Sequence, residues 1–77
     1  MEIPAFKIFI KVIRPNQTDV SVIEEIYKTG DFDLWSTYKM SYARWIDLHN
    51  GLPLRGYKIV SGYFSRIEMP TTQKKLK

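Results

Sequence analysis

Hydrophobic and polar side chains alternate near the start of the chain, in the segment AFKIFIKVI over residues 5–13. In an extended segment, side chains two apart share a face. One face would then carry Phe6, Ile8, Ile10 and Val12. Lysine recurs at every fourth position on the opposite face. This pattern predicts a β-strand that is half exposed on its lysine face or lies at a sheet edge. A turn is expected over residues 14–17, because Pro15 cannot donate to a strand ladder and Asn16 suits a turn.

The pattern changes after this turn, and the segment from Val20 to Thr29 predicts an α-helix. Its apolar positions fit one helical stripe, formed by Val22, Ile23, Ile26 and Tyr27. Thr18 or Asp19 can cap the first turn, and Gly30 suits the left-handed residue that often ends a helix.

Two further helices are expected in the middle of the chain. The first covers residues 34–39, with Asp33 as its N-cap, and Met40 links it to the second. The second covers residues 41–49, with Ser41 as its N-cap. We expect it to end at Asn50-Gly51, since Pro53 prevents continuation.

The remaining segment, residues 56–69, is rich in strand-forming residues and is interrupted at Ser61-Gly62. It predicts a hairpin or one bent strand that pairs with the N-terminal strand. The expected fold class is therefore α+β: an N-terminal strand, two or three helices in a helix-turn-helix-like arrangement, and a C-terminal strand or hairpin. A single domain is expected over residues 1–70, followed by a flexible basic tail over residues 71–77.

Composition narrows the class of protein. The 77 residues are 44% hydrophobic and 14% aromatic, which is enough for a small core. Twelve Lys and Arg against eight Asp and Glu give a net charge of +4, which favours a polyanionic partner, although three of the lysines lie in the tail. The chain has no cysteine, which excludes disulfides and thiolate zinc sites and favours the cytoplasm. No apolar run approaches the ~20 residues of a membrane span.

Residues for catalysis or metal binding do not form a recognisable pattern. His49 is the only histidine, so it has no cysteine or second histidine with which to hold a metal. Neighbouring carboxylates such as Glu24 and Glu25 point apart on a helix, and the four glycines are too scattered for a phosphate-binding loop. We therefore expect no enzymatic activity, no cofactor and no small-molecule substrate.

Residues 22–51 carry the most informative pattern: a helix, a glycine turn, a short helix, a tight turn, and a serine-capped helix ending in Asn-Gly. This pattern resembles the helix-turn-helix of bacterial and phage DNA-binding proteins, including resolvase-type and lac-repressor-type domains. Ile23, Tyr27 and Gly30 match the first part of the family pattern, and Met40-Ser41 matches the second.

The resemblance implies a recognition helix that starts at Ser41 and enters the major groove. Tyr42, Ala43 and Asp47 would then occupy base-reading positions, with Arg44 close to the DNA backbone. Lys39 would meet a phosphate from the turn. Apart from the resemblance, residues 51–57 are expected to form a plain helix-to-strand loop, with a wing-like connector as the alternative, from which Arg55 and Lys58 would extend the basic surface. Asp47 departs from the family, where many relatives carry Arg or Lys, and an aspartate near phosphates costs affinity.

The sequence thus predicts a non-enzymatic protein that binds duplex DNA, of the kind found among phage and bacterial transcription regulators, acting as a homodimer or with a larger protein partner. One alternative is a helical packing unit without groove contact. Another is a protein-interaction module that docks on a host enzyme through an aromatic patch or by strand addition. A third is a single-stranded nucleic acid or RNA binder that uses Tyr57, Tyr63 and Phe64 as stacking platforms. Trp35 and Trp45 are expected in the core.

Overall fold

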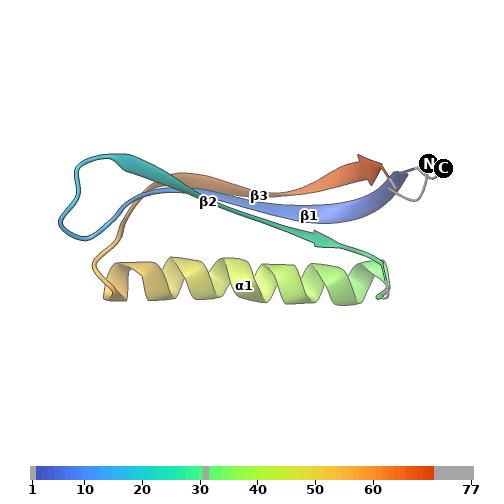
Figure 1. The fold of residues 1–77 in the computed structure, drawn as a ribbon. Helices are drawn as coiled ribbons and strands as arrows, with labels where there is room; N and C mark the ends of the chain where they lie inside the picture. Colours follow the sequence, from blue (N-terminus) through green and yellow to red (C-terminus); the bar gives the residue numbers. More distant parts are fainter. Residues whose placement is uncertain (1, 31, 71–77) are drawn as a thin grey trace.

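A computed structural model describes residues 2–30 and 32–70 of the protein. Its elements in chain order are β1 (Glu2–Ile13), β2 (Val20–Lys28), α1 (Leu34–Leu54) and β3 (Lys58–Pro70). The strands form one antiparallel sheet in the order β2-β1-β3. Helix α1 runs along one face of this sheet and leaves the other face uncovered (Figure 1). The predicted tail over residues 71–77 lies outside the described residues.

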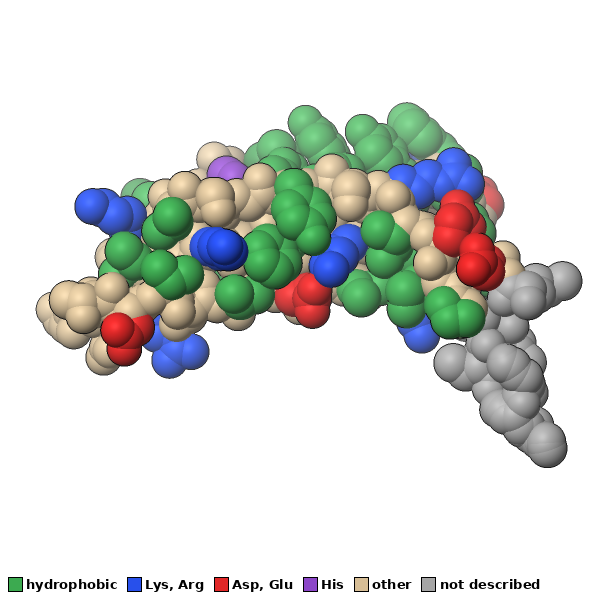
Figure 2. Space-filling model, turned by 90° about the horizontal axis from the view of Figure 1, so that it is seen from above, with side chains coloured by type: hydrophobic (Ala, Val, Ile, Leu, Met, Phe, Trp, Pro, Cys, Tyr) green, Lys and Arg blue, Asp and Glu red, His purple; other side chains and the backbone are tan. Residues whose placement is uncertain are grey.

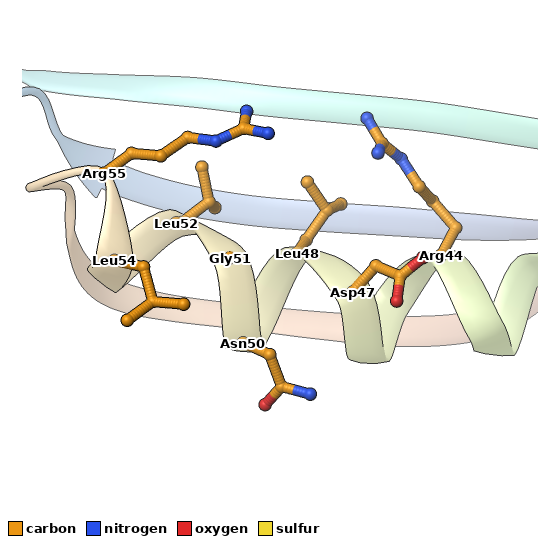
Figure 3. A pocket seen from close by; sticks show the side chains of 8 residues that line it. All are labelled: Arg44, Asp47, Leu48, Asn50, Gly51, Leu52, Leu54 and Arg55. Atoms are coloured by element: carbon orange, nitrogen blue, oxygen red, sulfur yellow. The ribbon is translucent and has the colours of Figure 1, made fainter.

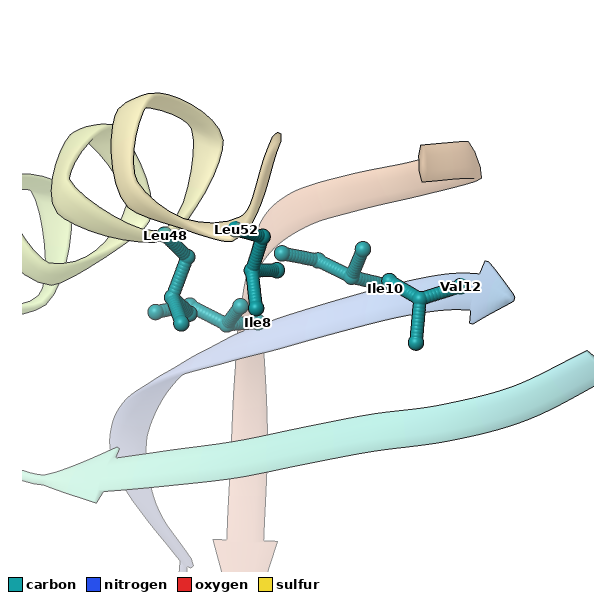
Figure 4. Packing of buried hydrophobic residues seen from close by; sticks show 5 residues of the cluster. All are labelled: Ile8, Ile10, Val12, Leu48 and Leu52. Atoms are coloured by element: carbon teal, nitrogen blue, oxygen red, sulfur yellow. The ribbon is translucent and has the colours of Figure 1, made fainter. Parts of the chain in front are cut away.

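The core lies between β1 and the second half of α1. The side chains of Ile8, Ile10 and Val12 pack against Leu48 and Leu52 (Figure 4). The predicted apolar face of the first strand is therefore confirmed, with Phe6 also buried on it. The prediction of an edge position is wrong, because β1 is the central strand and pairs on both sides.

The turn after β1 forms as predicted, and Asn16 adopts the left-handed backbone conformation with φ of 63°. The helix predicted over Val20–Thr29 is wrong, because this segment is the edge strand β2. Residues four apart share a face in both a helix and a strand, so the spacing of Ile23 and Tyr27 fits either. In the strand both side chains face α1 and pack on the core.

The two middle helices are one continuous helix, so the predicted helix-turn-helix arrangement is wrong. Asp33 is the N-cap as predicted, and its Oδ1 accepts a hydrogen bond of 2.6 Å from the backbone N–H of Ser36. Ser41 is not a cap. It is buried in the helix, and its hydroxyl donates to the carbonyl oxygens of Thr37 and Tyr38. Residues 36–42 contain neither Gly nor Pro, so nothing interrupts the helix at Met40.

Helix α1 also ends later than the sequence predicted. Gly51 lies inside it and Pro53 is in its last turn. The stop is Gly56, which has φ of +92° and donates its N–H to the carbonyl oxygen of Pro53. The N–H of Tyr57 donates to the carbonyl oxygen of Leu52, which completes a Schellman motif. This motif turns the chain back into β3 and lets both Leu52 and Tyr57 join the core.

The C-terminal segment forms a single strand, β3, which pairs with β1 along its length. The register shifts between Lys11 and Val12, which face Ser61 and Ile59, so Val60 is the extra residue of a bulge. Gly62 allows the backbones to approach closely at this point. A Cβ atom there would lie 2.7 Å from the carbonyl oxygen of Phe9.

Candidate nucleic-acid interface

The residues predicted to bind DNA do not share one surface. Ser41 is buried, and Tyr42 lies on the side of α1 that faces β3, where its ring is 5.9 Å from that of Phe64. Arg44 projects toward β2 instead. Lys39 and Ala43 are exposed on the helix, whereas Lys58 starts β3. Helix α1, which contains the predicted recognition helix, packs along the sheet, so the structure does not bring these residues together on one surface.

Arg44 is held by an ion pair within the protein. Its Nε and Nη2 donate to the carboxylate of Glu25 on β2, with distances of 3.0 and 2.9 Å to Oε1 and Oε2. The hydroxyl of Tyr27 donates to the same Oε1 at 3.0 Å. Hydrogen bonding from Arg44, more than from Tyr27, lowers the pKa of Glu25. The positive charge of Arg44 is therefore balanced on the helix side of the sheet.

This ion pair predicts an acid-dependent loss of stability. Because the folded-state pKa of Glu25 is lowered, its contribution is complete above the ordinary pKa of 4.5 and is lost as the pH falls through the folded value. Both side chains are partly exposed, so Glu25→Gln should cost about 1 kcal/mol or less at neutral pH. Chemical denaturation between pH 7 and pH 3 tests this, with the turn variant Asp19→Asn as control. Equal acid sensitivity of wild type and Glu25→Gln would contradict the assignment.

A groove of about 400 Å³ lies beside the second half of α1 and brings together three of the predicted residues, Arg44, Asp47 and Arg55. Arg44 lies at one end of the groove and Arg55 at the other. Both side chains extend toward β2, and Leu48 and Leu52 lie between them (Figure 3). Since Glu25 neutralises Arg44 and Asp47 offsets the charge of Arg55, the formal charges around the groove balance. The groove is a weak site for a polyanion.

The uncovered face of the sheet has the stronger combination of charge and aromatic surface. We call it the open face; it comprises the alternate β1 residues 5, 7, 9, 11 and 13 and the residues paired with them on β2 and β3. It carries Lys7, Lys11, Lys28 and Lys58 but a single acidic residue, Glu24. Viewed onto this face, hydrophobic side chains lie interspersed with basic ones (Figure 2).

Two aromatic rings stack at the centre of the open face. Phe9 on β1 lies directly opposite Tyr63 on β3, with ring centroids 5.1 Å apart and planes 12° from parallel. Tyr63 remains 45% exposed. The Nζ of Lys7 lies 5.9 Å from each ring centroid and forms an ion pair of 2.8 Å with Glu24. The site is thus an aromatic platform with a cation held at its edge.

The other lysines of the open face surround this platform. Lys11 follows Phe9 by two positions on β1, Lys28 ends β2, and Lys58 begins β3. All three are exposed, and none forms an ion pair with another of residues 2–30 and 32–70. The hydrogen bond to Glu24, and secondarily one with Tyr63, raises the pKa of Lys7. The positive charge of the open face therefore comes from Lys11, Lys28 and Lys58, since Glu24 balances the charge of Lys7.

Of the three sheet aromatics named from the sequence as stacking platforms, only Tyr63 lies on the open face. Phe64 points to the helix side, and Tyr57 packs on the core. Phe9 was missed, although its position between Lys7 and Lys11 on one strand face was a signal for it. Trp45 packs on the core as predicted, whereas the prediction for Trp35 is wrong, since it is 62% exposed.

The remaining candidate chemistry lies on the helix side. Nδ1 of His49 is 3.1 Å from the carbonyl oxygen of Trp45, and the two rings are in contact. No cluster of three potential metal ligands occurs in the part of the chain that the structure describes. Within the same residues, no helix combines the length and apolar character needed to cross a membrane.

Comparisons with protein-family models, with curated proteins and with solved structures give no match to this chain. The geometry of the open face is therefore the basis for assigning a function.

Proposed function

We propose that the protein is a non-enzymatic binder of single-stranded nucleic acid that uses the open face of its sheet. The observation that carries this proposal is the Phe9–Tyr63 stack, placed on an uncovered face among lysines. Proteins that bind single strands combine aromatic side chains, on which bases stack, with a positive surface that follows the phosphates. In this role the protein would act in the cytoplasm.

The shape of the site favours a single strand over a duplex. Bases in a duplex are stacked inside the helix, so their faces are not accessible to the Tyr63 ring. The major groove admits a helix or a two-stranded ribbon, whereas the open face is three strands wide. A single strand can place a base on Tyr63 while its phosphates reach Lys11 or Lys58.

Tyr63→Ala is expected to weaken binding of a single strand by roughly 5- to 150-fold, because stacking contributes ~1–3 kcal/mol per base. Tyr63→Phe should retain most of the affinity, since the ring remains. Lys11→Ala should weaken binding and reduce the slope of log K against log salt by about 0.7, the value for one lost phosphate contact on a single strand. Fluorescence anisotropy with labelled oligothymidine and oligouridine measures these effects.

Two matched variants serve as controls. Phe32→Ala removes an exposed aromatic in the connection between β2 and α1, and Lys39→Ala removes an exposed lysine on α1. Neither should change the affinity for a single strand. Tighter binding to a duplex of the same length, no binding at low salt, or equal losses in Tyr63→Ala and Phe32→Ala would each contradict the proposal.

A protein partner is a second candidate function, favoured by the aliphatic side chains on the β2 part of the open face. Val20, Val22 and Ile26 are all more than 40% exposed there. Such a row suits a partner with an apolar surface. The anisotropy experiment separates the two functions, because an absence of nucleic-acid binding at low salt would leave the protein partner as the better explanation.

A further inference from the structure

The outer edge of β3 is unpaired along a strand of 13 residues, since β1 is its only neighbour among the described strands. An exposed edge offers N–H and C=O groups to another strand. Among the described strands the outer edge of β2 is also unpaired, but Glu24 and Glu25 lie at its middle. Two copies of β2 paired about that point would bring like charges together. The edge of β3 is the better one for pairing with a second copy.

A row of aromatic residues lies above the same edge, on the flank of α1 that faces β3. We call this row the aromatic stripe; it comprises Trp35, Tyr38, Tyr42, Trp45 and His49. Its members alternate three and four positions apart, the spacing of a helix–helix seam. Consecutive rings stack from Trp35 to Tyr38 and from Tyr38 to Tyr42, with centroid distances of 5.6 and 5.8 Å.

The aromatic stripe is only half covered by its own chain. Phe64 lies beneath it, with ring centroids 5.9 Å from those of Tyr38, Tyr42 and Trp45. Trp35 and Tyr42 remain 62% and 44% exposed. Beside Trp35 lies an open apolar groove of about 420 Å³, with Phe6 and Leu34 in its wall and Arg66 of β3 as its charged group. Apolar surface beside an unpaired strand is typical of a protein interface.

We propose that this edge binds a second copy of the chain, with residues 64–70 of β3 pairing antiparallel to the same residues of the partner about a two-fold axis at Ile67, so that the two aromatic stripes meet at their Trp35 ends. The proposal is independent of nucleic-acid binding. Pairing of the two β3 strands would join the two three-stranded sheets into a single six-stranded sheet, with both open faces on the same side.

Charge complementarity sets the register. Arg66 and Glu68 project from the helix side of β3 and form a loose ion pair of 3.5 Å within the strand, in which both side chains are about half exposed. With the axis at Ile67, Arg66 of each copy lies directly opposite Glu68 of the other. An axis at Arg66 would instead place two guanidinium groups opposite each other, which costs stability.

The spacing of the elements allows the first turns of the two helices to meet. Helix α1 packs mainly over β1 and β3. Strands in a sheet are ~4.8 Å apart, so two such helices on adjacent copies of β3 would have axes roughly 10–14 Å apart. Small and medium side chains give helix separations of ~8–10 Å, and Trp and Tyr side chains are large enough to fill the wider gap. A second copy would thereby cover Trp35.

Charge reversal tests both the partner and the register. Arg66→Glu and Glu68→Arg should each raise the dimer dissociation constant by roughly tenfold or more, because like charges then face each other. The double variant, which exchanges the two residues, should restore the wild-type value. Sedimentation equilibrium without nucleic acid measures this constant, and circular dichroism confirms that each variant is folded.

Two further variants keep the test specific. Asp47→Arg makes the same kind of change on α1 at a residue outside the aromatic stripe and should leave the dimer intact. Trp35→Ala, at an exposed position, should weaken it without unfolding the chain. A wild-type chain that stays monomeric at millimolar concentration would overturn the proposal, as would single reversals without effect or a double variant that stays dissociated. Tyr63→Ala should still dimerise, which separates this result from the proposed function.

Discussion

Ile8→Ala is expected to destabilise the protein by about 2–5 kcal/mol, the range for truncating a buried isoleucine. Ile8 is fully buried on the central strand and packs in the cluster with Leu48 and Leu52. A chain of this size has few other core contacts to compensate, and small domains have a total stability of only ~5 kcal/mol or slightly more. The variant should therefore be largely unfolded at 37 °C, as measured by thermal unfolding followed by circular dichroism.

Val22→Ala provides the matched comparison for this core variant. Val22 is also an aliphatic residue of the sheet, but it lies on the open face and is 54% exposed. Its truncation should change the free energy of unfolding by about 0.5 kcal/mol or less. Similar losses in both variants would show that the open face is buried in the folded protein and would refute the assignment of a single core.

Gly62→Ala is expected to destabilise the protein by about 1–3 kcal/mol, although it adds only one methyl group. The new Cβ would lie 2.7 Å from the carbonyl oxygen of Phe9 and 3.4 Å from Cα of Ile10. Both are backbone atoms of the central strand, so relief requires β1 and β3 to move apart. Urea denaturation measures the loss.

Gly51→Ala is the control for this backbone variant and should have the opposite sign. Gly51 lies inside α1, where a Cβ would meet nothing within 4 Å. Replacing a helical glycine by alanine stabilises by roughly 0.5–1 kcal/mol. If Gly62→Ala lowered the free energy of unfolding no more than Gly51→Ala does, the close approach of β1 and β3 at Phe9 would be refuted.

Local signals in the sequence predicted the parts of the fold that depend on local chemistry. The alternation in β1, the turn at Pro15-Asn16 and the cap at Asp33 each follow from neighbouring residues. The prediction was wrong where tertiary contacts decide. The segment of β2 fits a helix as well as a strand, and its extended form is supported by pairing with β1 and by the bond between Glu25 and Arg44.

The helix α1 shows a second source of error. Ser41 has the residue type of an N-cap, but a serine within a helix can donate to the preceding turn, and only the structure distinguishes the two. Gly51 and Pro53 predicted that the helix ends near residue 50, whereas it continues to the Schellman motif at Gly56. Because the predicted recognition helix depended on a start at Ser41, this error also misplaced the candidate site.

The sequence predicted only part of the candidate interface. Tyr63 was named among the sheet aromatics, but its partner Phe9 and the shared face of Lys11 and Lys58 depend on the pairing of β1 with β3. These strands are separated by more than forty residues, so their register is a property of the folded chain.

The central position of β1 gives its residues two separate roles. Every second side chain, Ile8, Ile10 and Val12, is fixed by packing under α1, whereas those between them, Lys7, Phe9 and Lys11, face outward. Affinity and specificity on the open face can therefore be altered by substitution at the odd positions while the even positions keep the fold. The protein offers a scaffold in which the central strand can be redesigned for a new ligand at every other residue.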